Sequence, residues 1–160
     1  MNGTRPLPLL LAALSLVGLG IASYLTVAHW GDQPIACGGV GDCNLVNSSE
    51  YATVAGLPVS ALGGALYLGL ALTAALWVRR ARDDRLPVMY WGLALAGAGY
   101  ALYLTYVELA ILHAICVWCV TSAAILSVCL ALSSWAVLFG GAAVEDGPPG
   151  SSPVRRASRR

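Results

Sequence analysis

Four of the five cysteines form two pairs whose spacing suits thiol redox chemistry. Cys116 and Cys119 form a C-V-W-C motif that opens a long apolar run. Cys37 and Cys43 lie in a polar segment and are separated by five residues, three of them glycine. CxxC is a recognised redox spacing, and on a helix its two cysteines share one face. The two pairs therefore predict exchange between dithiols and disulfides.

The position of the CxxC motif at the start of a predicted helix favours a reactive thiolate, because free amide groups and the positive end of the helix dipole meet there. A low thiol pKa gives a better leaving group and a readily formed nucleophile. The alternative is a structural disulfide. A Cys37–Cys43 disulfide would close a short loop, so its entropic stabilisation should be modest. Cys129, about 15 Å deeper along the same helix, is interpreted as a buried apolar cysteine.

The elements that must position these cysteines are membrane helices. The chain has 160 residues, of which 58% are hydrophobic and 11% charged, whereas soluble domains carry about 25% charged residues. Four uncharged stretches exceed the roughly 18–20 residues needed to cross hydrocarbon. They run from about 7–28, 57–78, 86–107 and 113–140. We predict an all-α integral membrane protein, a bundle of four transmembrane helices with a large extracytoplasmic loop between the first and second helices.

The first stretch is interpreted as a retained helix and not as a signal peptide, because it is longer than a usual apolar signal region and its basic flank is thin. We predict one membrane domain over 1–144. The segment 145–160 is charged and rich in Pro, Gly and Ser, so we predict a disordered cytoplasmic tail. In the first loop, the glycine-rich half should be irregular, and Ser48–Ala55 is predicted as a short surface helix capped by Ser48 or Ser49.

The basic residues indicate the topology, because all nine are arginines on alternate connecting segments. They are Arg5, Arg79, Arg80, Arg82, Arg85, Arg155, Arg156, Arg159 and Arg160. The positive-inside rule then places both termini and the 79–85 loop in the cytoplasm, and both cysteine pairs outside. In that oxidising compartment paired cysteines are normally disulfides or redox-active dithiols. A zinc site built from four thiolates is disfavoured by this compartment and by the five-residue spacing, and no metal is expected.

Three segments together resemble the vitamin K epoxide reductase (VKOR) family, with the greatest likeness to its bacterial members. They are C-G-G-V-G-D-C-N-L-V-N-S-S-E, G-L-P-V-S-A-L-G-G-A-L-Y and Y-V-E-L-A-I-L-H-A-I-C-V-W-C-V-T-S. The resemblance extends from the first helix through the fourth. It implies a four-helix bundle around a quinone, with the CxxC motif at the outer end of the bundle.

The resemblance also implies a role for each cysteine. Cys119 would exchange electrons with a membrane quinone of the menaquinone or ubiquinone class, and Cys116 would be its disulfide partner. Cys116 would exchange with Cys43, and Cys37 would meet the thiol of an extracytoplasmic thioredoxin-like (DsbA-like) partner. The expected enzyme is a quinone-dependent thiol–disulfide oxidoreductase of the inner (cytoplasmic) membrane that supports disulfide formation. Its partners would be that protein, the quinone and the lipid bilayer, with no nucleic acid.

The sequence departs from the family pattern at several places. Many bacterial members carry a fused thioredoxin-like domain, whereas here a predicted tail follows the fourth helix, so a separate partner protein is expected. The animal enzymes have a quinone-holding tyrosine four residues beyond the second CxxC cysteine, where this chain has Ala123. An asparagine near the start of the second helix corresponds to Val59. Both positions argue against vitamin K epoxide as the substrate and leave quinone-linked thiol oxidation untouched.

Four further side chains near the outer end are candidates for the site, each with a simpler alternative role. Ser60 is a candidate donor to a quinone carbonyl, or it bonds within its own helix. Trp118 would cover the quinone or the disulfide, or it lies at the membrane interface. Glu108 would position the loop or handle protons, or it is solvated at the interface. His113 would pass protons, or it faces the headgroups.

Two other functions are carried as alternatives. One is a quinone or quinone-epoxide reductase, in which reduction of the quinone is the main physiological output. The other is a non-enzymatic four-pass structural protein with a disulfide-stapled loop. Such a protein would need the Cys37–Cys43 disulfide but would have no use for the CxxC motif, so replacement of Cys119 would leave it functional.

Overall fold

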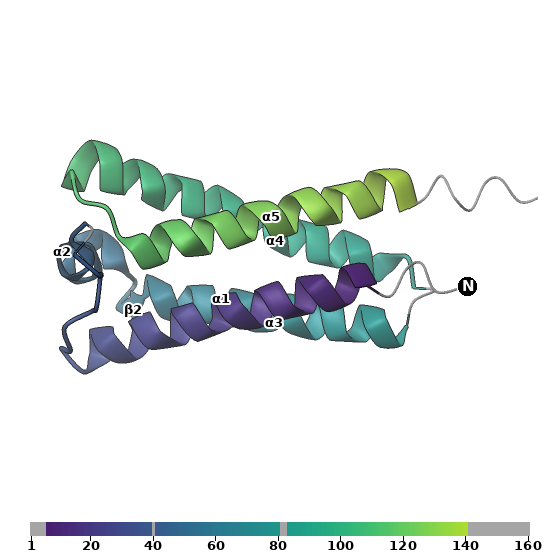
Figure 1. The fold of residues 1–160 in the computed structure, drawn as a ribbon, viewed down its shortest axis with the longest axis horizontal. Coiled ribbons are helices and arrows are strands. Elements are labelled where there is room, and N and C mark those ends of the chain that lie inside the picture. Colours follow the sequence, from purple (N-terminus) through teal and green to yellow (C-terminus); the bar gives the residue numbers. More distant parts are fainter. Residues whose placement is uncertain (1–5, 40, 81–82, 141–160) are drawn as a thin grey trace, which may run out of the picture.

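Four long helices dominate the computed structural model, which describes residues 6–39, 41–80 and 83–140. They are α1 (Pro6–Trp30), α3 (Val59–Arg79), α4 (Arg85–Val107) and α5 (Val117–Gly140), and they lie side by side as a bundle (Figure 1). All four are long and apolar enough to cross a membrane, with mean hydropathies from 1.4 to 2.0. The predicted class, a four-helix integral membrane protein, is confirmed. The predicted tail over 145–160 lies outside the described residues.

The four helices form a closed ring. Helix α1 packs mainly on α3 and α4 on α5, and contacts of α3 with α4 and of α1 with α5 complete the ring. Small residues let the helices approach closely, as is usual in membranes. Gly18 of α1 faces the ring of Tyr67 on α3, and a Cβ atom at Gly18 would overlap that ring.

Two buried tyrosines connect helices that lie diagonally across this ring. The Tyr90 hydroxyl on α4 lies 3.0 Å from Ser15 Oγ on α1. The Tyr67 hydroxyl on α3 lies 2.8 Å from Ser122 Oγ on α5 and also donates to the Ser122 carbonyl at 3.0 Å. An unpaired hydroxyl buried in such an apolar setting is costly. These contacts therefore favour one rotation of each helix about its axis.

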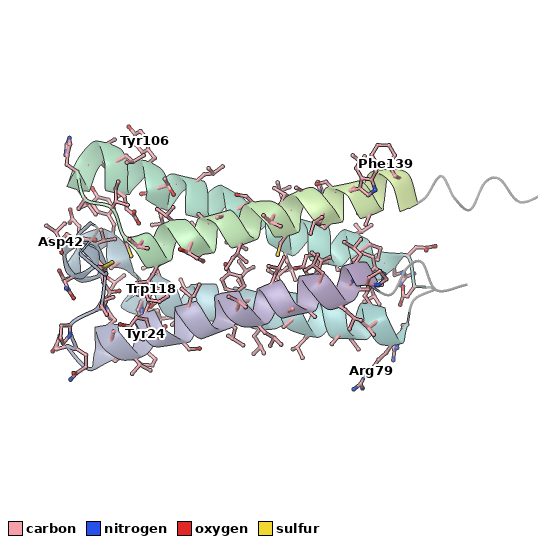
Figure 2. The ribbon with its side chains drawn as sticks, in the orientation of Figure 1. Tyr24, Asp42, Arg79, Tyr106, Trp118 and Phe139 are labelled. Carbon is pink, nitrogen blue, oxygen red and sulfur yellow. A yellow bond between two sulfur atoms is a disulfide. The ribbon has the colours of Figure 1, made fainter. Side chains whose placement is uncertain are left out.

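One end of the bundle carries the short elements between α1 and α3, and we call it the loop end (residues 31–58 and 113–116). These elements are α2 (Cys43–Ser48), the 3₁₀ helix η1 (Glu50–Ala52) and the antiparallel strands β1 (Thr53–Val54) and β2 (Leu57–Pro58). The start of α1, the end of α5 and the connection between α3 and α4 lie at the opposite end (Figure 1). Asp42 and Trp118 therefore lie far from Arg79 (Figure 2).

Of the helix predicted over Ser48–Ala55, the structure has only the 3₁₀ helix η1, with Ser49 at its N-cap position but without a side-chain cap bond, while the α-helix of this loop, α2, forms earlier. Asp42 caps α2, its carboxylate Oδ1 accepting the Leu45 amide at 3.0 Å, which is the usual role of an aspartate before a helix. Ser49 has an extended backbone and ends the helix. The first half of the loop is irregular as predicted, with positive φ angles at Gly38, Gly39 and Gly41.

The predicted fourth helix began four residues too early. Helix α4 continues into a π-helical turn, η2 (Glu108–Leu112), which ends at His113 in the left-handed conformation (φ 49°). The following amides are satisfied by Glu108, whose carbonyl accepts from Ala114 at 3.1 Å. Helix α5 then starts at Val117, so Cys116 precedes the helix. π-turns inside helices occur frequently at functional sites.

Candidate active site

Cys116 lies directly before α5 and caps its first turn. Its carbonyl accepts the Val120 amide at 3.0 Å, and its Sγ accepts the Cys119 amide at 3.4 Å. The sulfur therefore lies where free amides and the helix dipole favour negative charge. The pKa of the Cys116 thiol is lowered, mainly by a hydrogen bond with the Cys119 thiol and further by backbone amides, while burial and the Glu108 charge oppose this. The site thus favours a Cys116 thiolate.

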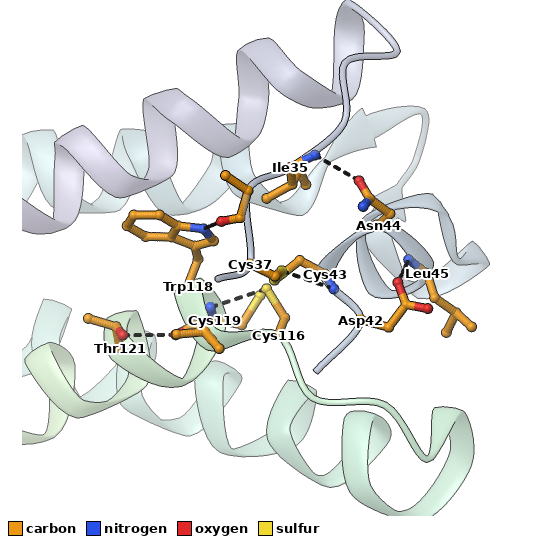
Figure 3. The surroundings of a disulfide bond; sticks show 12 residues. Ile35, Cys37, Asp42, Cys43, Asn44, Leu45, Cys116, Trp118, Cys119 and Thr121 are labelled. Carbon is orange, nitrogen blue, oxygen red and sulfur yellow. Dashed lines mark hydrogen bonds between the residues drawn. A yellow bond between two sulfur atoms is a disulfide. The ribbon is translucent and has the colours of Figure 1, made fainter. Parts of the chain in front are cut away.

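Cys37 and Cys43 form a disulfide at the loop end (Figure 3), and the two residues differ in exposure. Cys37 is half-buried, whereas Cys43, the first residue of α2, has no exposed surface. Cys43 packs in one buried cluster with Cys116, and the side chains of Cys37 and Cys119 pack against that cluster. A thiol from outside can therefore approach Cys37, while Cys43 faces the interior.

The two cysteine segments are joined by a backbone hydrogen bond. The Asp42 amide donates to the Ile115 carbonyl at 3.1 Å. Gly41 allows this approach, because it has a φ of 74° and a Cβ atom there would overlap the Ile115 carbonyl. Only glycine readily adopts this conformation without steric cost. The contact holds the start of α2 against the segment that leads into the CxxC motif.

The residue before Cys37 is held from two sides. Trp118 Nε1 donates to the Ala36 carbonyl at 2.9 Å (Figure 3), and the Ala36 amide donates to the Tyr24 hydroxyl at 3.1 Å. The two aromatic rings lie 5.3 Å apart between centroids. We call Tyr24, Ala36 and Trp118 the Ala36 clamp. The clamp connects α1, the Cys37 segment and the CxxC motif itself.

A cavity of about 360 Å³ lies beside the CxxC motif in the loop-end half of the bundle. Side chains from all four long helices line it, and α2 and η1 contribute at its outer end. The lining is mainly apolar, with a few polar groups. This size and character suit a small, largely apolar molecule with a few polar atoms.

Four of the eight predicted site residues line this cavity, and besides Cys37 and Cys43 two others do not. Cys116, Cys119, Val59 and Ser60 are lining residues, whereas Trp118 and Ala123 are not. Trp118 instead belongs to the Ala36 clamp. Ser60 is not bonded within its own helix, since its Oγ accepts from Thr26 Oγ1 at 3.0 Å.

The remaining candidate residues lie in different environments. His113 is exposed, and its Nδ1 lies 3.2 Å from the Ile111 carbonyl. Glu108 is buried and lines the cavity. Cys129 is fully buried in the apolar core of the bundle. The sequence did not indicate Tyr24, Gly41 or Ile115, whose roles depend on contacts between distant segments.

A bundle of membrane helices that holds a disulfide and a buried CxxC dithiol in one cluster, next to an apolar cavity, defines a membrane oxidoreductase with a cysteine redox centre. The sequence matches the model of the Vitamin K epoxide reductase family over residues 9–134. Because the match covers most of the chain, the protein belongs to this family, as its sequence motifs predicted.

Proposed function

We propose that this protein oxidises the thiols of an extracytoplasmic thioredoxin-like (DsbA-like) protein and passes the electrons to a membrane quinone, which supports disulfide formation. One observation carries the proposal: the four sulfurs are graded from accessible to enclosed. Cys37 is half-buried, Cys43 and Cys116 are buried in one cluster, and Cys119 lines the apolar cavity. This order supports a relay from a soluble donor to an acceptor dissolved in the bilayer.

In the first exchange, a thiolate of the partner attacks Cys37 Sγ and Cys43 leaves as a thiolate. The second partner thiol then displaces Cys37, so that the partner leaves with a disulfide and Cys37 and Cys43 become a dithiol. Attack at Cys37 is favoured because access to the sulfur governs the rate of such exchange. Cys43 can act as the leaving group inside the buried cluster that it shares with Cys116.

In the second exchange, Cys43 attacks Cys116 in an oxidised Cys116–Cys119 pair, and Cys119 leaves. Cys37 then attacks Cys43, which restores the Cys37–Cys43 disulfide and leaves Cys116 and Cys119 as thiols. The structure has this arrangement, with Cys37 bonded to Cys43 and the CxxC cysteines free.

The cavity residues suit a quinone headgroup, which is a flat apolar ring with two carbonyl oxygens. Val59 and the other apolar side chains would contact the ring, and Cys119 lies in the wall. Ser60 Oγ lies 3.0 Å from Thr26 Oγ1, whose single hydrogen also reaches the Ala22 carbonyl at 2.7 Å, so a quinone carbonyl would compete with Thr26 for the Ser60 hydroxyl hydrogen. When bound, a quinone would accept two electrons and two protons. Trp118 and Ala123 have no part in this proposal.

We propose further that the loop end faces outward from the cytoplasmic membrane and that both termini are cytoplasmic. Arg79, Arg80 and Arg85 lie at the end of the bundle opposite the cysteine pairs. The loop end carries Asp32, Asp42 and Glu50. Because arginines accumulate on cytoplasmic segments, this distribution supports that orientation.

The test is quinone reduction by the purified protein in detergent, driven by a reduced thioredoxin-like protein. We expect the wild type to turn over, and Cys119→Ala to lose activity with every donor. Cys37→Ala should fail with the protein donor but still accept electrons from a small dithiol. Cys129→Ala, which alters a cysteine outside the cluster, is the matched control and should remain active. Full activity of Cys119→Ala, or no wild-type activity with any quinone, would favour the structural four-pass alternative.

A further inference from the structure

Glu108 is the only buried carboxylate in the part of the chain that the structure describes, with 3% of its surface exposed. It opens the π-helical turn η2 at the outer end of a membrane-spanning helix. An ionisable side chain in such a position is costly to keep, and by default it indicates a function. The local structure is also unusual, because the turn ends at His113 in the left-handed conformation.

The contacts of Glu108 all lead to the CxxC motif. Its Oε2 accepts the Cys116 amide at 3.0 Å. The side chain lines the same cavity as both cysteines. There its carboxyl group is close enough to the Cys119 thiol for the charges of the two groups to influence each other. One carboxyl group is therefore fixed by an amide of the motif and lies beside a reacting sulfur.

The oxidation of the inner pair needs a group that takes a proton. The site favours a thiolate at Cys116, so Cys119 carries the proton of the dithiol. This sulfur lies in the wall of an apolar cavity, where proton transfer to bulk water is hindered. The other titratable groups that line the cavity are phenols, which are much weaker bases than a carboxylate. They are Tyr51, Tyr67 and Tyr100.

We propose that the Glu108 carboxylate accepts the proton of the Cys119 thiol as the Cys116–Cys119 disulfide forms. This inference rests on the proposed function, which supplies a quinone as the oxidant. In the step, the Cys119 S–H bond breaks and one S–S bond forms between the Cys116 thiolate and Cys119. The electron pair is delivered to the quinone, together with the proton held by Glu108 and one proton from solution at the loop end.

Glu108→Gln separates this role from a purely positional one. Its side-chain carbonyl can still accept the Cys116 amide, but it cannot take a proton. The first measurement is the rate at which a short-chain quinone oxidises the reduced inner pair in detergent. We expect Glu108→Gln to slow this step by about 100-fold, as is typical for loss of a general base. Glu50→Gln, which alters an exposed glutamate on η1, is the matched control and should leave the rate unchanged.

The second measurement uses no quinone. The reduced inner pair is alkylated with iodoacetamide over a range of pH, in a variant with serine at Cys37, Cys43 and Cys129. Loss of the negative charge beside the two sulfurs should let thiolate form at lower pH, so Glu108→Gln should react faster than the parent at neutral pH. A positional role alone predicts no such acceleration. Slower oxidation with faster alkylation therefore supports the proposal.

The failures of the two proposals are distinguishable. If the wild type reduces quinone and Glu108→Gln oxidises its inner pair at the same rate, the inference about Glu108 is wrong and the proposed function stands. An unchanged alkylation profile in Glu108→Gln also overturns the inference. If the wild type itself does not react with quinones, the proposed function is wrong. Should Glu108→Gln not fold, Glu108→Asp, which retains a carboxylate on a shorter side chain, should oxidise its inner pair faster than Glu108→Ala, and equal rates in these two variants would overturn the inference.

Discussion

The amide of Asp42 and the carbonyl of Ile115 are joined by a hydrogen bond of 3.1 Å, and each of these residues directly precedes a cysteine. The bond fixes the backbone one residue before Cys43 to the backbone one residue before Cys116. Both cysteine side chains are fully buried in the same cluster. The fold therefore favours exchange between Cys43 and Cys116 over the other combinations of the two pairs.

A trapping experiment tests this preference. In the double variant Cys37→Ala with Cys119→Ala, the two remaining cysteines of the cluster are Cys43 and Cys116. We expect them to form a disulfide under mild oxidation, detected by mass spectrometry after differential alkylation. The matched control, Cys43→Ala with Cys116→Ala, leaves Cys37 and Cys119 and should form much less disulfide. Equal yields in the two variants would mean that the Asp42–Ile115 bond does not select the pair.

The membrane helices and the cysteine pairs could be predicted from the sequence, because each depends on local composition or spacing. Uncharged stretches of sufficient length indicate spanning helices, and the CxxC spacing indicates a dithiol. The boundary at Cys116 could not be predicted, since it depends on the π-turn that starts at Glu108. That turn is stabilised by contacts with the amides of Ala114 and Cys116. Such contacts produce no periodic pattern of side chains that could be recognised in the sequence.

The arrangement of side chains around the disulfide also could not be predicted from the sequence. Asp42 is a typical helix cap, but the glycines before it indicate an irregular segment. The helix of this loop was therefore predicted later, with Ser48 or Ser49 as its cap. The Ala36 clamp joins Tyr24 to Trp118, residues on the first and last helices, and such contacts depend on the rotation of each helix in the bundle. Trp118 was therefore assigned to the quinone, whereas the structure places its indole against the Ala36 carbonyl.

The Ala36 clamp should slow the opening of the outer disulfide. Trp118→Phe keeps an aromatic ring near Tyr24 but removes the hydrogen bond to the Ala36 carbonyl. A hydrogen bond of this kind contributes about 1 kcal/mol, equivalent to about fivefold in an opening equilibrium. We expect dithiothreitol to reduce the Cys37–Cys43 disulfide faster by roughly that factor, measured by timed alkylation.

Trp91→Phe is the matched control for the clamp. Its indole also donates a hydrogen bond, to Ser134 Oγ at 3.0 Å, but from α4 to α5 and away from the cysteines. In this variant, dithiothreitol should reduce the Cys37–Cys43 disulfide at the wild-type rate. An equal acceleration in both variants would indicate general loosening of the bundle, and no acceleration in Trp118→Phe would show that the clamp does not restrain Cys37.

The reactivity of Cys116 should persist to lower pH than that of an ordinary thiol. Its pKa is lowered, first by the hydrogen bond with the Cys119 thiol. The thiolate is thus present above this lowered pKa, and reactivity is lost only as the pH falls through it. Cys119→Ala removes the hydrogen-bond donor that makes the largest contribution, so the loss should occur at a higher pH.

The measurement is the alkylation rate of Cys116 against pH in reduced protein with serine at Cys37, Cys43 and Cys129. Thr121→Val is the control, because Thr121 lies in the first turns of α5 and bonds only to the Val117 carbonyl. Its profile should match that of the parent. If Cys119→Ala gives the same profile as the parent, the Cys119 thiol is not what favours the Cys116 thiolate.

The close approach of α1 to α3 can be tested with two glycines on one helix. A Cβ atom at Gly18 would overlap the ring of Tyr67, which is buried and held by Ser122. Gly18→Ala should therefore lower the free energy of unfolding by about 1–3 kcal/mol, as is usual for an overpacked core. A Cβ atom at Gly20 has no neighbour within 4 Å, so Gly20→Ala should be neutral or slightly stabilising, since alanine favours helices.

The stabilities of the two variants are compared by thermal unfolding in the same detergent. Both variants replace glycine by alanine in α1, so their change in helix propensity is the same and the difference between them reports the overlap with Tyr67. Because Tyr67 also lines the cavity, displacement of its ring in Gly18→Ala should weaken quinone turnover as well. A smaller side chain should relieve the overlap, so Gly18→Ala combined with Tyr67→Leu should lose less stability than the sum of the two single variants. Strict additivity, or equal stability of Gly18→Ala and Gly20→Ala, would mean that α1 and α3 do not meet at this point.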